Sequence, residues 1–322
     1  MPTVLGQNQY GKAETRVVRV TREGPVHHIR DLNVSIALSG AMSDVHTKGS
    51  NAGVLPTDTT KNTVFAFAKE HGIASAEDFA MRLARHFVSG QETIHTARIR
   101  VEEYGWDRIR TDGDAAHSFV RRGRETRTAQ VTYHGQSGEQ GGQSGQGGQG
   151  GQGEQWQVLS GLKGLVVMNT TDSEFHGYVK DRYTTLPETR DRILATEVNA
   201  CWRHARQQEG GEGEQAGKPD WDASYERARG HLLAAFAGTY SLSLQQTLYA
   251  MGSRIVEQEP GIDEIRLSLP NKHHFLADLR PFGLDNDNEV YFAADRPYGL
   301  IEATVLRDGA TAAVPVDLTN LP

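Results

Sequence analysis

The chain has 322 residues, of which 37% are hydrophobic and 23% are charged, and its formal net charge at pH 7 is -7. This composition is typical of a soluble globular protein, and the length is enough for about two domains. The acidic balance argues against a nucleic-acid-binding protein, because such proteins usually carry a basic stripe. Cys201 is the only cysteine, which excludes an intrachain disulfide and a metal site made of several thiolates.

Targeting signals are not evident in the sequence. The first residues, MPTVLGQNQYGK, lack the apolar stretch of a signal peptide, and no long apolar run follows that could form a membrane span. The last residues, TNLP, differ from the peroxisomal Ser-Lys-Leu signal. We therefore expect a cytoplasmic protein that has neither a membrane nor a nucleic acid as its partner.

A Gly- and Gln-rich tract, GQSGEQGGQSGQGGQGGQGEQ at 135–155, separates two halves of similar length. It contains no apolar side chain, so it cannot offset the entropy lost on ordering, and we expect a disordered linker. The predicted domains are then 1–134 and 156–307, followed by a C-terminal tail at 308–322.

The first half begins with a short strand at 16–20. The stretch DLNVSIALSG at 31–40 alternates apolar and polar residues at period two, which predicts a second strand. A helix is expected from about Asp58. Ser75 and Asp78 have the spacing of a capping box at the start of a second helix.

Strand patterns then return, and the second half repeats the order. Ala97, Ile99 and Val101 share one face of a predicted strand, and another strand is expected near 127–133. The elements expected after the tract are apolar runs near 156–168, a helix around 221–236, a helix that Ser243 and Gln246 open, a strand at Ile265, Leu267 and Leu269, and a last strand near 299–306.

Each half therefore has the order strand–strand–helix–helix–strand–strand. One antiparallel sheet with two helices on one face is the natural packing, which is an α+β fold. We expect the other face of such a sheet to be apolar enough to need a partner, so the sequence predicts an oligomer.

The sequence offers little support for a metal or nucleotide cofactor. Adjacent histidines occur at 27–28 and 273–274, but neighbours on extended chain point to opposite faces and rarely bind one metal. His-Glu-x-x-His, paired cysteines, a phosphate-binding loop and a nucleophilic serine elbow are missing from the sequence, and no Gly-x-Gly-x-x-Gly follows a predicted strand.

Short polar clusters lie where the predicted elements end. They are QYGK (9–12), PTDTTKNT (56–63), SEFHGY (173–178), TTLPETRDRI (184–193), SLQQT (243–247) and SLPNKHHF (268–275). Each cluster alone fits a solvated turn or a helix cap, and Thr57 or Asp58 could be an ordinary N-cap. Taken together and in this order, the clusters resemble the urate oxidase (uricase) family. The resemblance runs from Tyr10 to about residue 306, apart from the Gly/Gln tract and a polar loop at 207–220.

This resemblance implies two tandem T-fold (tunnelling-fold) domains in each chain and a homotetramer whose sheets close into a tunnel. The family oxidises urate with molecular oxygen and water to 5-hydroxyisourate and hydrogen peroxide, a step of purine catabolism. It uses neither a metal nor an organic cofactor.

The resemblance also implies which residues bind the flat urate anion. Arg192 would recognise the anion with its planar fork, and Gln245 would donate and accept hydrogen bonds along the opposite ring edge. Phe175 would stack on the purine face, and Leu186 and Leu244 would line the pocket, with the backbone N–H of Leu244 as a further donor. On its own, Arg192 would be assigned to a surface ion pair.

Proton transfer would fall to a relay formed by Lys12, Thr57 and His273, because a histidine gains or loses a proton near neutral pH. Asn271 would hold oxygen and then water above the ring. Pro270 ends the preceding strand, so that Asn271 and His273 project into the pocket, whereas His274 has no assigned role. In the family, the pocket lies between two subunits, and Thr57 and Asp58 come from the neighbour.

Two alternatives remain open on the sequence. The chain could be another purine- or pterin-handling T-fold enzyme, although those with zinc need a histidine cluster that the sequence does not show. It could also be a purine-binding tetramer without catalysis. The complete set of Lys12, Thr57, Asn271 and His273 argues against a pure binding protein, because binding alone needs no proton relay.

Overall fold

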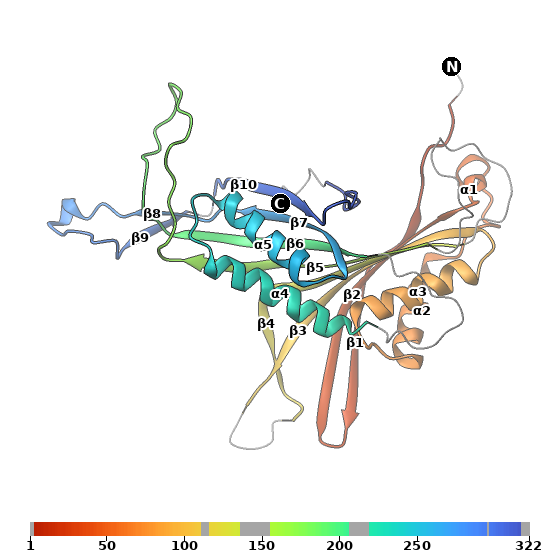
Figure 1. Ribbon diagram of the computed structural model, residues 1–322. Helices are drawn as coiled ribbons and strands as arrows, with labels where there is room; N and C mark the ends of the chain where they lie inside the picture. Colours follow the sequence, from red (N-terminus) through yellow and green to blue (C-terminus); the bar gives the residue numbers. More distant parts are fainter. Residues whose placement is uncertain (1–2, 111–115, 136–154, 206–218, 295, 317–322) are drawn as a thin grey trace. The chain divides into compact units, whose positions relative to one another are not determined.

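The structure is a computed structural model that describes residues 3–110, 116–135, 155–205, 219–294 and 296–316 (Figure 1). The chain divides into two compact units. Unit 1 contains Met1–Ser160 and Arg206–Trp221, and unit 2 contains Gly161–Ala205 and Asp222–Pro322. The predicted disordered linker lies almost wholly outside the described residues, and so does most of the polar loop at 207–220.

Unit 1 has the predicted order of elements. Its elements are β1 (Tyr10–Glu23), β2 (Val26–Gly40), α1 (Ser43–Thr47), α2 (Thr57–Glu70), α3 (Ala76–Ser89), β3 (Ile94–Arg108) and β4 (Phe119–His134). Each strand pairs antiparallel with the next along the chain. The short helix α1 is the one element that the sequence did not predict here. The α+β fold expected from the duplicated pattern is confirmed for this half.

Helices α2 and α3 pack on one face of this sheet (Figure 1). The apolar positions of the strand pattern are buried beneath them, as are Phe79, Leu83 and Phe87 on α3. The hydroxyl of Ser75 accepts a hydrogen bond from the N–H of Asp78 at 3.0 Å, so this helix begins where the capping pattern predicted. Local capping and period-two burial together place the helices on the sheet.

Unit 2 repeats the plan with an insertion. Its elements are most of β5 (Gln155–Asn169), then β6 (Leu194–His204), α4 (Trp221–Gly238), α5 (Leu244–Gln258), β7 (Ile262–Pro270), β8 (His273–Leu276), the 3-10 turn η1 (Arg280–Phe282), β9 (Tyr291–Ala294) and β10 (Leu300–Leu306). The sheet order in this unit is β5-β6-β7-β10. Helix α5 begins as predicted, because the hydroxyl of Ser243 accepts from the N–H of Gln246 at 3.2 Å.

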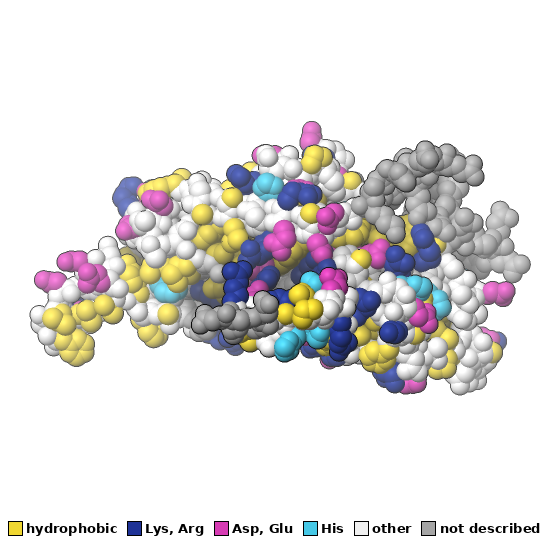
Figure 2. Space-filling view, turned by 90° about the horizontal axis from the view of Figure 1, so that it is seen from below, with side chains coloured by type: hydrophobic (Ala, Val, Ile, Leu, Met, Phe, Trp, Pro, Cys, Tyr) yellow, Lys and Arg dark blue, Asp and Glu magenta, His cyan; other side chains and the backbone are white. Residues whose placement is uncertain are grey.

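The hairpin of β8 and β9 was not predicted. Its register runs from His273 opposite Ala294 to Leu276 opposite Tyr291. Four-residue strands are too short for an alternation pattern to reveal. Strands β8 and β9 and the residues between them, 273–294, form an arm. This arm carries exposed hydrophobic side chains, including Phe282, which is 74% exposed. Figure 2 shows hydrophobic side chains gathered at the left end of the molecule, where this arm lies in Figure 1.

The sheet face turned away from the helices carries both polar and exposed apolar side chains, and the apolar ones include Val18, Val166 and Met168. In unit 1, Ser35, Arg100 and Gln130 lie side by side on neighbouring strands of this face. In unit 2, Arg266 and Glu302 form an ion pair at 3.3 Å there. The alternation that buries one set of residues places their polar neighbours on the opposite face.

The first residues of the predicted tail are bound to unit 2. The carboxylate of Glu264 accepts hydrogen bonds from the backbone N–H groups of Ala313 and Val314, at 2.8 and 2.9 Å. Arg203 donates to the carbonyl of Thr311 at 3.1 Å.

In the described ranges, no helix has both the length and the apolar composition required to cross a bilayer.

Candidate active site

Lys12 lies where strand β1 is forced into an unusual geometry. A Cβ added to Gly11 would be 1.9 Å from the carbonyl oxygen of Ile36, so only glycine allows the two strands to approach this closely. The register then shifts between Lys12 and Thr15, and Glu14 has a φ of 56°. Such a bulge re-aims a side chain at the rim of a sheet. The YGK motif therefore has a backbone reason for its glycine.

Tyr10 connects this strand to the start of α2. Its hydroxyl accepts a hydrogen bond from the N–H of Leu55 at 2.8 Å, just before the helix begins. The helix starts at Thr57, with Pro56 in the cap position and no side-chain cap bond. The N-cap alternative for Thr57 and Asp58 is therefore wrong. Tyr10 was inside a motif but had no predicted role, because only the fold shows what its hydroxyl reaches.

Asp58 is held on the exposed side of the first turn of α2. Its carboxylate pairs with Lys61 at 2.5 Å and accepts from Asn62 at 3.0 Å. The hydrogen bond from Lys61 is the largest cause of the lowered pKa of Asp58, and the charge of Lys12 lowers that pKa further. Lys12 is thus near enough to Asp58 in unit 1 for their charges to interact, and Thr57 is the neighbour of Asp58 in the chain.

Arg192, Phe175 and His273 are gathered in unit 2. The guanidinium carbon of Arg192 lies 5.1 Å from the ring centroid of Phe175, and its Nε donates to the hydroxyl of Ser173 at 3.1 Å. In the described part of the chain, the two Nη groups have no hydrogen-bond partner. Burial lowers the pKa of Arg192, because loss of solvent disfavours the charged guanidinium. The site thus presents a fork beside an aromatic face.

The turn that follows β7 is fixed from both sides. Strand β7 ends at Pro270 as predicted, and the N–H of Asn271 donates to the carbonyl of Gly299 at 2.8 Å. The N–H of Lys272 donates to the carbonyl of Ala195, also at 2.8 Å. His273 does not lie in a loop, as the polar cluster suggested, but begins β8. These backbone bonds hold the Asn271 and His273 positions on a rigid part of the sheet.

Two neighbours affect the imidazole of His273. Burial is the largest cause of its lowered pKa, and the charges of Arg192 and His274 lower it further. The neutral form, which can accept a proton, therefore dominates at pH 7. The Nδ1 of His274 lies 3.0 Å from the carbonyl of Lys272, so that ring turns toward its own backbone.

The remaining residues predicted to bind urate in unit 2, Leu244, Gln245 and Leu186, differ in how much of the side chain is exposed to solvent. Leu244 is 3% exposed and packs in the hydrophobic core, so its side chain cannot line an open pocket. Its backbone N–H lies in the first turn of α5, where N–H groups lack partners within the helix. Gln245 follows it and is exposed. Leu186 is half exposed, and its carbonyl accepts from the hydroxyl of Tyr178, which stacks on Phe175 at 4.8 Å.

Unit 2 therefore brings together a planar cation at Arg192, the aromatic rings of Phe175 and Tyr178, and the neutral imidazole of His273. Ser173 and Tyr178, which contact Arg192 and Phe175, lie in the SEFHGY cluster but had no predicted role, because only the fold shows what they reach. Over the described ranges, no three His, Cys, Asp or Glu side chains are grouped so that they could hold a metal ion.

Comparison with known proteins identifies the family. The uricase family model matches residues 8–132 and 158–302. The chain is 49% identical over 313 residues to the uricase of Arthrobacter globiformis, which covers 97% of this chain and 93% of that protein. The chain belongs to the uricase family.

Two further comparisons agree. The chain is 34% identical over 304 residues to the uricase of Oryctolagus cuniculus, covering 92% of this chain and 93% of that one. The crystal structure of the uricase from Arthrobacter globiformis is similar with a TM-score of 0.84 and 48% identity, over 98% of this chain and 99% of that chain. The two segments that the family model matches leave 133–157, with the Gly/Gln tract, outside the family pattern. The resemblance to uricases and the α+β T-fold are confirmed.

Proposed function

We propose that this chain is a urate oxidase, which converts urate, molecular oxygen and water to 5-hydroxyisourate and hydrogen peroxide. Membership of the uricase family supports this proposal, with similarity along nearly the whole chain. The observation that carries it furthest is the guanidinium of Arg192 beside the ring of Phe175, at 5.1 Å, with the neutral imidazole of His273 close enough for Arg192 to lower its pKa.

Urate is a planar purine anion, and its recognition needs donors in the ring plane and a stacking surface. The Nη fork of Arg192 suits the oxygen and nitrogen atoms of one ring edge, and Phe175 suits the ring face. The amide of Gln245 and the backbone N–H of Leu244 would address the other edge. Leu186 would supply apolar contact at the rim.

Catalysis would then depend on proton transfer and on the position of oxygen. His273, Thr57 and Lys12 form the proposed relay that takes a proton from urate and later activates water. Asn271 would hold oxygen above the ring, because its amide can donate to a developing peroxide without titrating. Two electrons pass from urate to oxygen, which leaves as hydrogen peroxide, and water supplies the new hydroxyl. The protein contributes deprotonation and orientation rather than a redox group.

We propose that each complete site joins two copies of the chain in a homotetramer. Lys12, Thr57 and Asp58 lie in unit 1, whereas the proposed urate-binding residues lie in unit 2. The copy that binds urate would receive Thr57 and Asp58 from its neighbour. The polar side chains on the second face of each sheet, such as Arg100 and Arg266, would suit a water-lined tunnel through such an assembly. We also propose that the protein is cytoplasmic and uses neither a metal nor an organic cofactor.

The deciding experiment measures loss of urate absorbance and release of peroxide by protein dialysed exhaustively against EDTA. We expect both signals in equal amounts, and roughly 100-fold less of each with an Arg192→Ala variant that is otherwise folded. If wild-type protein oxidises no urate under these conditions, the proposal is wrong. If activity returns only with a stoichiometric metal, the metal-free mechanism is wrong, and a metal-dependent T-fold enzyme becomes the better description.

A further inference from the structure

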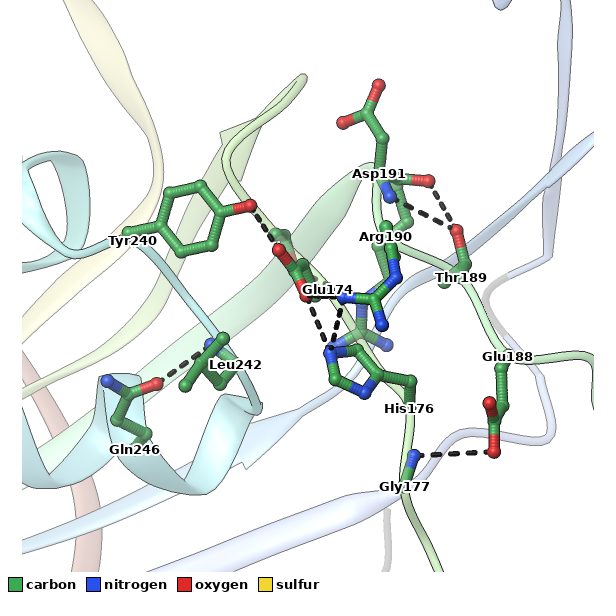
Figure 3. Close-up of polar contacts among 12 residues, drawn as sticks. Glu174, His176, Gly177, Glu188, Thr189, Arg190, Asp191, Tyr240, Leu242 and Gln246 are labelled. Carbon is green, nitrogen blue, oxygen red and sulfur yellow. Dashed lines mark hydrogen bonds and ion pairs between the residues drawn. The ribbon is translucent and has the colours of Figure 1, made fainter.

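Glu174, next to the proposed stacking residue, lies at the centre of a network that the urate chemistry does not use (Figure 3). Its side chain is only 14% exposed. One carboxylate oxygen, Oε1, accepts a hydrogen bond from the hydroxyl of Tyr240. The other, Oε2, lies 2.7 Å from Nε2 of His176 and 3.6 Å from Nη1 of Arg190. A partly buried carboxylate with three polar partners is held in one orientation.

The three partners come from three different segments of unit 2. His176 lies in the segment that carries Phe175, Arg190 lies two residues before Arg192, and Tyr240 precedes the turn that leads into α5 with Leu244 and Gln245. We call these stretches, 172–176, 189–192 and 240–245, the binding segments. Each contributes at least one residue to the proposed urate site. Figure 3 shows the side chains of Tyr240, Arg190 and His176 all turned toward Glu174.

Backbone hydrogen bonds also join these segments, and one of them runs from the N–H of Ser241 to the carbonyl of Asp172 at 2.8 Å. The N–H of Glu174 donates to the carbonyl of Ser241 at 2.7 Å. Phe175 and Thr189 exchange two bonds, at 2.9 and 3.0 Å. These bonds fix how close the backbones of the three stretches come. The Glu174 carboxylate adds side-chain contacts, to His176 in its own segment and to Arg190 and Tyr240 in the other two.

The charges of the network support this geometry. The hydrogen bond from Tyr240 is the largest cause of the lowered pKa of Glu174, and His176 and Arg190 lower it further. The same hydrogen bond raises the pKa of Tyr240. At neutral pH the carboxyl is therefore ionised and the phenol is protonated, so the contact is a charge-assisted hydrogen bond.

We propose that Glu174 is a positioning residue of the urate site: its carboxylate holds the three binding segments so that Phe175, Arg192 and Gln245 converge on one planar ligand. This inference rests on the proposed function, because it concerns the same site. Recognition of a rigid ring depends on donors and the stacking face being held to within a fraction of an ångström. Loosening one segment would misplace one of the three contacts and weaken urate binding.

Tyr240→Phe is the mildest test, because it removes one hydroxyl from a side chain that is 50% exposed. The readouts are KM and kcat for urate, the Kd for urate by calorimetry without oxygen, and the melting temperature. We expect KM and the anaerobic Kd to rise together by roughly 10-fold, with an unchanged melting temperature, because misplaced groups cost binding more than folding. The matched control is Tyr249→Phe on α5, where the tyrosine is 65% exposed.

A role in folding alone predicts a different result: a lower melting temperature or fewer active sites, with KM and Kd unchanged in the protein that remains native. Glu174→Gln keeps the shape and an acceptor for Tyr240 but loses the charge that faces His176 and Arg190. We expect it to raise KM and Kd as well. The double variant should raise KM by less than the product of the two single effects, because both changes act on one hydrogen-bond network.

Unchanged KM and Kd in both single variants, with a wild-type protein that oxidises urate, would overturn the positioning role and leave the proposed function intact. A rise in the Tyr249→Phe control equal to that in Tyr240→Phe would overturn it too. A wild-type protein that neither binds nor oxidises urate would overturn the proposed function, and the positioning role with it.

Discussion

A mixture of two inactive variants can test whether the site is shared between copies. Arg192→Ala removes the planar cation, whose Nε is bonded to Ser173 and whose two Nη groups would face urate. Two hydrogen bonds between charged groups contribute about 3 kcal/mol together, which is roughly a 100-fold loss of kcat/KM. Thr57→Ala interrupts the proposed relay, where general acid–base catalysis contributes about 100-fold or more. Each variant alone should therefore keep about 1% of wild-type activity.

Mixing should restore much more than that. If Thr57 of one copy serves Arg192 of another, a pocket is intact when an Arg192→Ala chain lends Thr57 to a Thr57→Ala chain. In an equal, random mixture, the chain that supplies residue 192 to a pocket has an intact Arg192 with a probability of about one half. The chain that supplies residue 57 has an intact Thr57 with the same probability, so about a quarter of the pockets are intact in a closed assembly. The assay measures urate consumption after the subunits have been exchanged by mild denaturation and refolding.

The control mixes the Thr57→Ala/Arg192→Ala double variant with wild type. Its urate-oxidising activity should not exceed that of the wild-type chains in the mixture. Exchange itself is measured separately, by mass spectrometry of assemblies in which one variant carries a tag. If exchange is complete and activity stays near 1% of wild type, the whole site lies within one chain. The shared-site proposal would then be wrong, although the urate oxidase proposal would stand.

Other predictions concern stability, strand geometry and pH. Glu77 is fully buried and pairs with Arg127 at 2.6 Å, so Glu77→Ala should lower the free energy of unfolding by about 3–5 kcal/mol in urea denaturation. Adding Arg127→Met should recover part of this loss, and no recovery would contradict the buried-charge explanation. Gly11→Ala should destabilise unit 1 by about 1–3 kcal/mol, because its Cβ would meet strand β2 at 1.9 Å. Gly230→Ala, with open space around it, should not. Burial lowers the pKa of His273 from 6.5, so kcat/KM should persist as pH falls and be lost only below 6.5. A midpoint above 6.5, or an acid limb that survives in His273→Gln, would exclude His273 as the base.

The sequence alone determined most of the secondary structure. Alternation at period two located the strand whose buried face includes Leu32 and Leu38, because a strand exposes one face to water and buries the other. Ser75 and Ser243 located the first turns of two helices, because a cap bond joins residues only three apart. The family resemblance rested on short clusters in a fixed order, which can be recognised in the sequence without any knowledge of packing. These signals are local, so they can be read along the chain.

Only the tertiary structure decided what the side chains of those clusters contact. Leu244 was predicted to line a pocket but is in the core, because the direction of a helix residue depends on what the helix packs against. The β8–β9 arm is too short for a pattern, and its pairing joins residues far apart in the sequence. Glu174 is bonded to Tyr240, 66 residues away, and no local pattern relates the two. Contacts of that kind exist only after the chain has folded, because the sheet and helices bring the segments together.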